Sequence, residues 1–183
     1  MPHVMIDLET MSTAPNAAIM QIGACVFEFS SPIKSEIIKI DVALQSSLLA
    51  GGHVDPDTVK WWNSQRHELK RDFGWATVHI HDALTQFSEW FDQEQKRSPI
   101  EGVWSHGASF DIPVLESAYR SVGLPVPWDY RLVRDTRTVH WLAQNLGWEK
   151  PKREVAHTAV EDALAQCDEL RGATTHLQVR VGR

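Results

Sequence analysis

The chain begins with a short apolar run that ends in two acidic residues, His3-Val-Met-Ile-Asp-Leu-Glu-Thr10. Side chains two positions apart on a strand project from the same face, so Asp7 and Glu9 are expected to lie together. Two carboxylates at that spacing repel each other unless a cation lies between them, and Mg²⁺ and Mn²⁺ favour such oxygen ligands. The alternative is an acidic pair that faces solvent at a strand end.

Two later segments add acidic residues and one histidine. Asp111 ends Trp104-Ser-His-Gly-Ala-Ser-Phe-Asp111, where a loop after a short strand enters a helix, although an aspartate there often serves only as a helix cap. The other segment is His157-Thr-Ala-Val-Glu-Asp-Ala163. On a continuous helix His157 shares a face with Glu161, whereas Asp162 can act with His157 only if His157 precedes the helix. Geometry leaves both acidic residues open.

The length and composition indicate one domain over residues 1–183, with its core over about residues 3–172. Hydrophobic residues make up 43% and charged residues 23% of the chain, as in ordinary soluble proteins. Cys25 and Cys167 lie in apolar stretches without metal-ligand spacing, which predicts buried thiols in a reducing compartment. No apolar run approaches the roughly 20 residues that span a bilayer. We therefore expect a cytoplasmic protein without a membrane partner.

The formal net charge of −6 argues against a nucleic-acid partner only if the acidic residues are spread over the surface. Two divalent cations bound by four carboxylates would present a positive centre to a phosphate. Basic residues between positions 130 and 153 either line a nucleic-acid groove or form a solvated surface. They are Arg131, Arg134, Arg137, Lys150, Lys152 and Arg153.

Apolar periodicity predicts an α/β fold with a mixed five-stranded sheet flanked by helices. The expected strands span residues 3–9, 20–29, 36–44, 103–105 and 131–133. A helix is expected to start at the Asp55-Pro56 cap and lead into residues 59–62, and further helices are expected at residues 81–96, 111–122, 136–145 and 158–171. In such a sheet the acidic strand ends gather at one edge, where α/β folds place their sites.

Taken in order, Asp-x-Glu-Thr, Phe-Asp after a small-residue loop, and His-x-x-x-x-Asp-Ala resemble the motifs of the DnaQ-like DEDDh 3′→5′ exonucleases, which have a ribonuclease H-like fold. The resemblance covers residues 3 to about 170. It looks closest to the phage and prophage exodeoxyribonuclease branch, which is related to ribonuclease T and to the Rv2179c-like exoribonucleases. Three further segments resemble that branch: Thr58-Val-Lys-Trp-Trp62, the segment from Trp104 to Asp111, and Pro127-Trp128 followed by Arg134-Asp-Thr-Arg-Thr138.

The resemblance implies a site of four carboxylates and one histidine. Asp7, Glu9, Asp111 and Asp162 are expected to bind two divalent cations, Mg²⁺ or Mn²⁺, with His157 as general base; this selects Asp162 over Glu161. No other cofactor is expected. The substrate is expected to be the 3′ end of single-stranded DNA or RNA, released as nucleoside 5′-monophosphates. A homodimer is a further expectation, because relatives such as ribonuclease T form dimers.

Five residues are candidates for substrate contact. Thr10 and Met11 directly follow Glu9 and are placed to meet the terminal sugar and base. His106 stands close to the position where many relatives have asparagine, so it either replaces that contact or leaves it missing. Trp61 and Trp62 either stack on bases or pack in the core. The branch resemblance favours DNA, but one or two side chains suffice to read a 2′-hydroxyl, so the sequence does not distinguish DNA from RNA.

Two other functions are compatible with part of this pattern. A ribonuclease H-like endonuclease or resolvase also gathers carboxylates on such a sheet, but it does not require the spacing from His157 to Asp162. A non-catalytic nucleic-acid-binding module has no reason to retain all five residues. The complete set therefore favours the exonuclease.

Overall fold

The chain forms a mixed five-stranded sheet in the order β3-β2-β1-β4-β5, which confirms the expected fold class. The computed structural model describes residues 1–32, 34–65, 76–152 and 157–178. β1 (His3–Thr10) pairs antiparallel with β2 (Ile19–Phe27), and β2 pairs antiparallel with β3 (Lys34–Asp41). β4 (Val103–Ser105) runs parallel to β1 and to β5 (Val133–Asp135). β1 is therefore the central strand.

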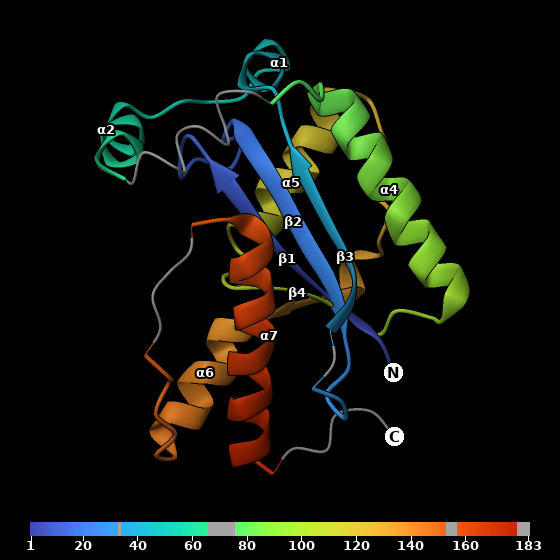
Figure 1. The fold of residues 1–183 in the computed structure, drawn as a ribbon, viewed down its shortest axis with the longest axis vertical. Coiled ribbons are helices and arrows are strands. Elements are labelled where there is room, and N and C mark those ends of the chain that lie inside the picture. The colour runs from blue at the N-terminus through green and yellow to red at the C-terminus, as the bar shows by residue number, and fades with distance from the viewer. Residues whose placement is uncertain (33, 66–75, 153–156, 179–183) are drawn as a thin grey trace.

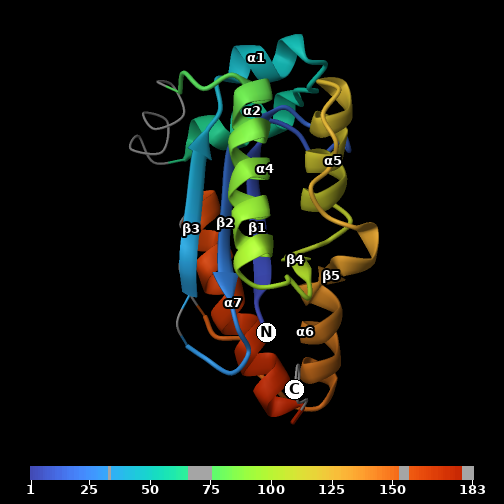
Figure 2. The same cartoon turned by 90° about the vertical axis from the view of Figure 1, so that its right-hand side faces the viewer.

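Helices cover both faces of this sheet. They are α1 (Leu44–Leu49), α2 (Pro56–Ser64), α4 (Ile80–Arg97), α5 (Asp111–Ser121), α6 (Thr136–Asn145) and α7 (Ala159–His176). In Figure 1 α7 crosses in front of the sheet, where it contacts β1 and β2, and α6 packs against α7. α4 and α5 pack on the opposite face, and Figure 2 looks onto the sheet with α4 in front of the strands and α7 behind them.

The two faces of β1 bury different side chains, because successive residues of a strand point to opposite sides. Val4, Ile6 and Leu8 belong to the larger hydrophobic core, which α4 and α5 complete. Met5 belongs to a smaller core, which the inner side of α7 completes. Asp7 and Glu9 continue the Met5 face along the strand, so the alternation of β1 presents both carboxylates to α7.

The fifth strand lies two residues later than the sequence indicates. Arg131 and Leu132, expected in a strand, form a 3₁₀ helix with Tyr130, because the Asp129 side chain accepts a hydrogen bond from the Arg131 amide at 2.9 Å. The strand then spans Val133–Asp135, where Arg134 pairs with Trp104 of β4. A local turn thus replaces the start of the expected strand.

The third strand ends at Asp41, earlier than expected, and Leu44 begins the short helix α1 instead. Two serine hydroxyls of α1 accept hydrogen bonds from distant backbone amides: Ser46 Oγ from Ile80 at 2.9 Å and Ser47 Oγ from Ile19 at 2.9 Å. These contacts stabilise α1 from outside its own sequence. The last helix also continues beyond its expected end at Arg171, to His176.

Cys25 and Cys167 are both buried, with their sulfur atoms 3.5 Å apart between β2 and α7. The prediction of buried thiols is therefore confirmed. No helix in the described part of the chain combines the length and the apolar character needed to cross a bilayer.

Candidate active site

The carboxyl end of β1 brings three acidic side chains from two elements together. Ligand oxygens of Asp7, Glu9 and Asp162 all lie within 4.8 Å of one another. Asp7 and Glu9 come from β1, and Asp162 comes from the first turn of α7. Glu9 and Asp162 are 9% and 6% exposed, so the cluster is largely removed from water.

The close approach of α7 to β2 sets the position of Asp162. A Cβ atom added at Gly23 would lie 2.3 Å from the backbone carbonyl carbon of Ala159, so any larger residue would push the helix away. The Ala159 amide donates a hydrogen bond to Gln21 Oε1 at 2.7 Å. Gln21 lies opposite Glu9 in the β1–β2 register. The same strand pair therefore positions Glu9 and the start of α7.

Asp111, at the start of α5, lies near this cluster, where its charge acts on Asp7 and Glu9. It is 3% exposed and follows the turn at Gly107, whose φ of 104° is a conformation that glycine adopts without strain. The Ala108 amide in this turn donates to Asp135 Oδ1 at 3.3 Å, and Asp135 also caps α6. Asp135 thus links the loop before Asp111 to α6 without entering the carboxylate cluster.

Burial raises the pKa values of Asp7, Glu9 and Asp111, and neighbouring carboxylates add to the shift at Asp7 and Glu9. Burial, followed by the charges of Asp111 and Glu9, raises the pKa of Asp7 well above its usual range. Burial, followed by the charges of Asp162 and Asp111, raises the pKa of Glu9 to about 8. Burial also raises the pKa of Asp111 to about 7, although hydrogen bonds from backbone amides and the charge of Arg137 oppose the shift. The protein alone therefore disfavours the ionised forms of these three acids.

The residues fit a divalent cation. Carboxylate oxygens are the ligands that Mg²⁺ and Mn²⁺ prefer, and a bound cation would reverse the mutual repulsion. One neighbouring group also lacks a partner: Gln166 Oε1 is buried and makes no hydrogen bond with any residue that the structure describes. Asp7, Glu9 and Asp162, with Asp111 beside them, are the described residues that could hold such ions.

His157 lies just before α7, the placement that the sequence requires if Asp162 is its partner. Its φ of 55° turns the chain sharply, and its backbone amide donates to Asp162 Oδ2 at 3.1 Å. Glu161 is exposed instead, and its Oε2 accepts from the Thr158 hydroxyl at 2.8 Å. The His157 ring meets the Trp61 ring edge to face, with 4.9 Å between centroids. Asp162 therefore belongs to the cluster and Glu161 does not.

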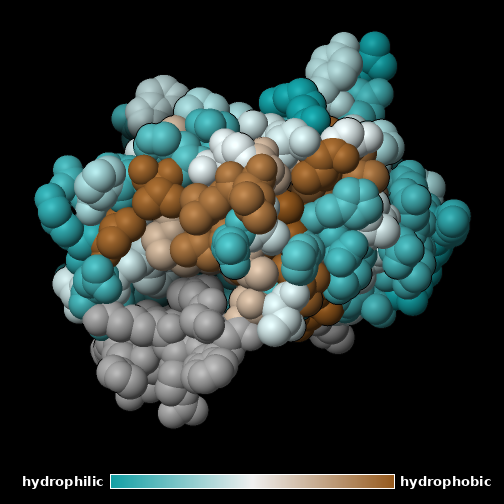
Figure 3. Space-filling view, turned by 90° about the horizontal axis from the view of Figure 1, so that it is seen from above, coloured by the Kyte–Doolittle hydropathy of each residue, from teal (hydrophilic) through white to brown (hydrophobic). Residues whose placement is uncertain are grey.

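A hollow of about 380 Å³ opens beside Glu9, within the size range of small-molecule sites. The side chains that line it include Glu9, Thr10, Trp61 and Phe110. Figure 3 looks onto this end of the molecule, where a band of apolar surface is flanked by hydrophilic side chains. The hollow thus offers apolar surface directly next to the carboxylates.

The two adjacent tryptophans have different surroundings. Trp62 is 6% exposed, and its Nε1 donates to the Thr10 carbonyl at 2.9 Å. Trp61 is 42% exposed and stands between the Trp62 ring and the His157 ring, at 4.9 Å from each centroid. Trp62 therefore holds the end of β1, whereas Trp61 presents open ring surface.

Two other candidates for substrate contact lie outside this hollow. Met11 does not line it, and its backbone is paired with Ala18 and Asp55. His106 faces α6 instead: its Nδ1 lies 2.8 Å from Thr136 Oγ1, and its ring lies 5.5 Å from the His140 ring. Burial lowers the pKa of His106 to about 4, so its ring is neutral at neutral pH.

The basic residues between 130 and 153 are mostly engaged. Lys150 pairs with Glu169 at 2.8 Å, and Arg131 pairs with Asp129 at 3.5 Å. Arg134 donates to the carbonyls of Arg131 and Val133. The Arg137 guanidinium packs over Gly107, where a Cβ would lie 3.1 Å from its Cζ, and it is the basic group that acts on Asp111. Lys152 is exposed, and Arg153 lies outside the described residues.

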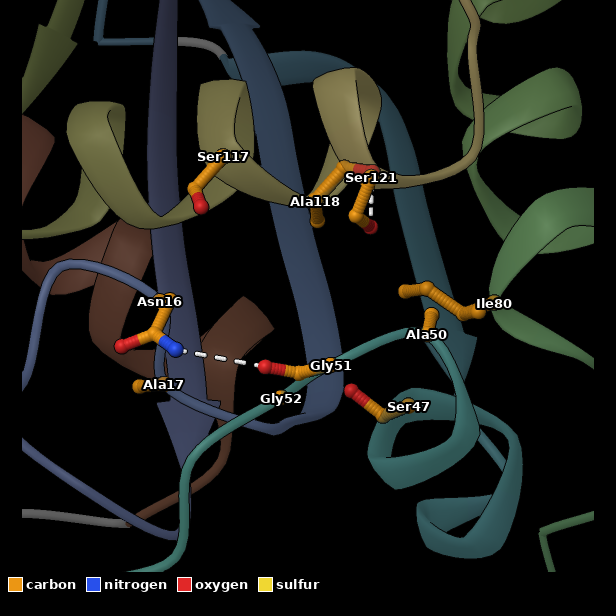
Figure 4. A pocket seen from close by; sticks show the side chains of 10 residues that line it. All are labelled: Asn16, Ala17, Ser47, Ala50, Gly51, Gly52, Ile80, Ser117, Ala118 and Ser121. Carbon is orange, nitrogen blue, oxygen red and sulfur yellow. Dashed lines mark hydrogen bonds between the residues drawn. The ribbon is translucent and has the colours of Figure 1, made fainter.

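A second, smaller hollow lies between α1, α5 and the loop at Asn16 (Figure 4). Alanine, glycine and serine side chains dominate its walls, and the Asn16 amide donates to the Gly51 carbonyl at 3.2 Å. No charged side chain lines it. It offers no group for acid–base or metal chemistry.

The family of 3′-5′ exoribonuclease Rv2179c-like domains matches residues 2–172. The chain belongs to this family. Membership confirms the expected resemblance to DnaQ-like 3′-5′ exonucleases. Among the expected relatives, the match falls on the exoribonucleases. No curated protein sequence matches the chain.

Solved structures share the fold at low sequence identity. Cell-death related nuclease 4 aligns with a TM-score of 0.68 and 11% identity over 96% of this chain and 64% of its own. Exonuclease I from Methylocaldum szegediense aligns with a TM-score of 0.68 and 16% identity over 95% of this chain and 40% of its own. The nuclease domain of 3′hExo, a DEDDh family member bound to rAMP, aligns with a TM-score of 0.60 and 12% identity over 100% of this chain and 96% of its own.

Sequence reasoning missed two glutamines at this site. Gln21 holds the start of α7, and Gln166 donates from its Nε2 to Asp7 Oδ1 at 2.7 Å. Gln166 lies one helical turn after Asp162, so the i+4 spacing on a helix was an available signal. Gln21 had no comparable signal, because its contact with Ala159 spans most of the chain.

Proposed function

We propose that this protein is a metal-dependent 3′→5′ exonuclease that removes nucleotides from single-stranded RNA ends. The observation that carries the proposal is the approach of Asp7, Glu9 and Asp162 within 4.8 Å of one another, with Asp111 as their charged neighbour and His157 at the entrance to α7. Five residues of the types that phosphodiester hydrolysis requires thus come from three separate segments of the chain.

The four carboxylates hold the cations in this proposal. When bound there, two divalent ions, Mg²⁺ or Mn²⁺, would supply positive charge that favours attack of water on the phosphate. Asp7 is the central member of the set, because the charges of Asp111, Glu9 and Asp162 all act on it. The raised pKa values of Glu9 and Asp111 mean that metal binding displaces protons at neutral pH.

His157 acts as the general base. An imidazole accepts a proton near neutral pH, which suits removal of a proton from the attacking water. The backbone contact with Asp162 holds the residue at the cluster, while its side chain remains outside the ligand set. Cleavage by water at the terminal phosphodiester yields a nucleoside 5′-monophosphate.

The hollow beside Glu9 receives the terminal nucleotide. Trp61 and Phe110 offer ring surface for the base, and Thr10 lines the hollow next to Glu9. Trp62 donates a hydrogen bond to the Thr10 carbonyl. Stacking on an aromatic ring is worth about 1–3 kcal/mol per base. We therefore expect Trp61→Leu to raise KM about tenfold. Trp141→Leu is the matched control, because Trp141 is also an exposed tryptophan, at 65%, but lies on α6 outside the hollow.

RNA is the favoured polymer because the family is described as exoribonuclease and the 3′hExo nuclease domain was solved with rAMP. DNA is the alternative, since exonuclease I of Escherichia coli was solved with deoxyoligonucleotides. The two polymers differ at the 2′-hydroxyl, which one or two side chains can read. The choice between RNA and DNA therefore requires an experiment on RNA and DNA strands of the same sequence.

The decisive test is a time course on 5′-labelled single-stranded RNA and DNA of one sequence, with Mg²⁺, with Mn²⁺ and with chelator. We expect a metal-dependent ladder that shortens from the 3′ end, faster on RNA, and absent with Asp111→Asn, which keeps the shape of the side chain. Internal cuts would indicate an endonuclease. No cleavage of either polymer in the presence of metal would refute the proposal.

A further inference from the structure

A neutral side chain contacts the central carboxylate of the proposed site. Gln166 lies on α7 one turn after Asp162, is 4% exposed, and donates from its Nε2 to Asp7 Oδ1 at 2.7 Å. We propose that Gln166 is a positioning residue that holds the Asp7 carboxylate in the orientation in which it binds a cation. This inference rests on the proposed function, because it assigns Gln166 a role toward the same metal site.

The chemistry of the contact fixes the direction of the amide. A carboxylate accepts hydrogen bonds, so the amide nitrogen must face Asp7 when Asp7 is ionised, as a metal ligand is. Such a charge-assisted bond is shorter and stronger than one between neutral groups. It occupies one of about four lone-pair positions of the carboxylate and leaves the others for a cation. Gln166 thus restrains Asp7 without competing for its ligand positions.

The amide oxygen of Gln166 distinguishes a positioning role from a role in packing alone. Gln166 Oε1 is buried and makes no hydrogen bond with the residues that the structure describes. An unpaired buried acceptor lowers stability, so an apolar side chain of similar size would serve packing alone equally well or better. Gln21, another buried glutamine, has both ends paired: its Nε2 donates to Asp41 and its Oε1 accepts from Ala159. Gln21 joins structural elements, whereas the side-chain bond that Gln166 makes within the described residues goes to a proposed metal ligand.

The expected effect is a loss of metal affinity. Groups that hydrogen-bond a metal ligand typically contribute 10–100-fold to metal affinity or activity. We expect Gln166→Met, which keeps the length of the side chain but cannot donate, to weaken Mn²⁺ binding about tenfold. Because Asp7 itself remains, saturating Mn²⁺ should bring the exonuclease kcat of this variant back to within a few-fold of wild type. A role limited to packing would leave the Mn²⁺ affinity unchanged.

The experiment measures the Mn²⁺ dissociation constant of the metal-free full chain by electron paramagnetic resonance, for wild type, Gln166→Met and Gln144→Met. Gln144 is an exposed glutamine of α6 and serves as the matched control. Thermal melting without metal reports stability separately, and we expect Gln166→Met to melt no lower than wild type. If Gln166→Met does not fold, Gln166→Asn, whose amide is one carbon short of Asp7, is expected to show the same weakening.

The outcomes separate this inference from the proposed function. The positioning role is supported if wild type binds Mn²⁺ and Gln166→Met binds it about tenfold more weakly. Equal binding by wild type and Gln166→Met overturns the positioning role alone. Failure of wild type itself to bind Mn²⁺ overturns the proposed function and this inference with it.

Discussion

The two ends of β1 bury titratable side chains in different ways. At the amino end, His3 is 5% exposed and packs against Phe27, Phe29 and Trp104, with ring centroids 5.0–6.2 Å away. The indole Nε1 of Trp104 donates to His3 Nδ1 at 3.3 Å. At the carboxyl end, Asp7 and Glu9 meet other carboxylates instead of aromatic rings. The same strand therefore carries one buried group with complementary neighbours and two whose neighbours repel them.

This difference shows how burial that serves structure differs from burial that serves chemistry. Burial lowers the pKa of His3 to about 4, so the ring is neutral at neutral pH and needs no counterion. Burial raises the pKa values of Asp7 and Glu9, but neutralising them requires a proton or a cation from outside the chain. Strongly shifted pKa values gather at functional sites for this reason. Neighbouring rings of the protein surround His3 at the amino end, whereas under the proposed function a cation offsets the charge of the carboxylates at the carboxyl end.

The largest expected effect comes from removing the central carboxylate. We expect Asp7→Asn to lower the exonuclease rate at least about 10⁴-fold, because the metal site supplies both charge stabilisation and water activation. The metal-free variant should be no less stable than wild type, since the substitution removes a repelled carboxylate. Rate measurements and thermal melting in chelator check both parts. A variant that melts lower but retains activity would mean that Asp7 is structural, like His3.

The second prediction separates a role of His157 in proton transfer from a role in metal binding at the carboxyl end of β1. We expect His157→Gln to lower kcat about 10²–10⁴-fold, the usual contribution of a general base. Mn²⁺ binding should be unchanged, because the contact of His157 with Asp162 uses the backbone amide and persists in the variant. Single-turnover rates and Mn²⁺ titration measure the two quantities. Loss of Mn²⁺ binding would instead assign His157 to the assembly of the metal site.

The third prediction tests the amino end. His3→Ala should lower the free energy of unfolding by about 2–4 kcal/mol, because it opens a cavity among three aromatic rings and leaves the Trp104 indole without its acceptor. The exonuclease rate of the folded variant should stay within about twofold of wild type. Denaturant unfolding and rate measurements well below the melting temperature check this. A large loss of activity in the folded state would contradict the separation of the two ends.

Much of the fold can be predicted from the sequence, because most helices and strands follow from patterns among neighbouring residues. Residues 103–105 and 136–145 form a strand and a helix with the expected boundaries, and β1 differs from its expected range by one residue. The helix α1 was missed because its stabilising contacts, from Ser46 to Ile80 and from Ser47 to Ile19, join distant segments. The early end of β3 follows from the same contacts.

The candidate site also contains residues that local sequence patterns predict and residues that depend on contacts between distant segments. Helix geometry left Glu161 and Asp162 open, and the family resemblance selected Asp162. The turn at His157 gives the physical reason, because it lets the His157 amide donate to Asp162. Trp61 and Trp62 are indistinguishable in sequence, because adjacent helical residues point about 100° apart and only the docking of α2 decides which one is buried. Gln166 has an i+4 spacing to Asp162 that was an available signal, but its contact with Asp7, 159 residues away, could not be read from the sequence. Physical contacts of that range have no local signature.

The last prediction compares the two ends directly through pH. His3 has a folded pKa of about 4, below its ordinary 6.5, so the unfolded chain binds more protons between these values and stability falls as pH decreases through that window. Glu9 has a folded pKa of about 8, above its ordinary 4.5, so the folded chain binds more protons and stability falls as pH increases from 4.5 toward 8. Each group contributes at most about 1.4 kcal/mol per pH unit.

These opposite slopes can be separated with one variant at each end. In chelator, the free energy of unfolding of wild type should fall toward pH 4 and again toward pH 8. His3→Phe should reduce the loss on the acid side only, and Glu9→Gln the loss on the alkaline side only. Mn²⁺ should remove the alkaline loss in wild type, because a cation replaces the proton that Glu9 otherwise needs. An alkaline loss that persists at saturating Mn²⁺ would place its origin outside the carboxylate cluster and would end the contrast between the two ends of β1.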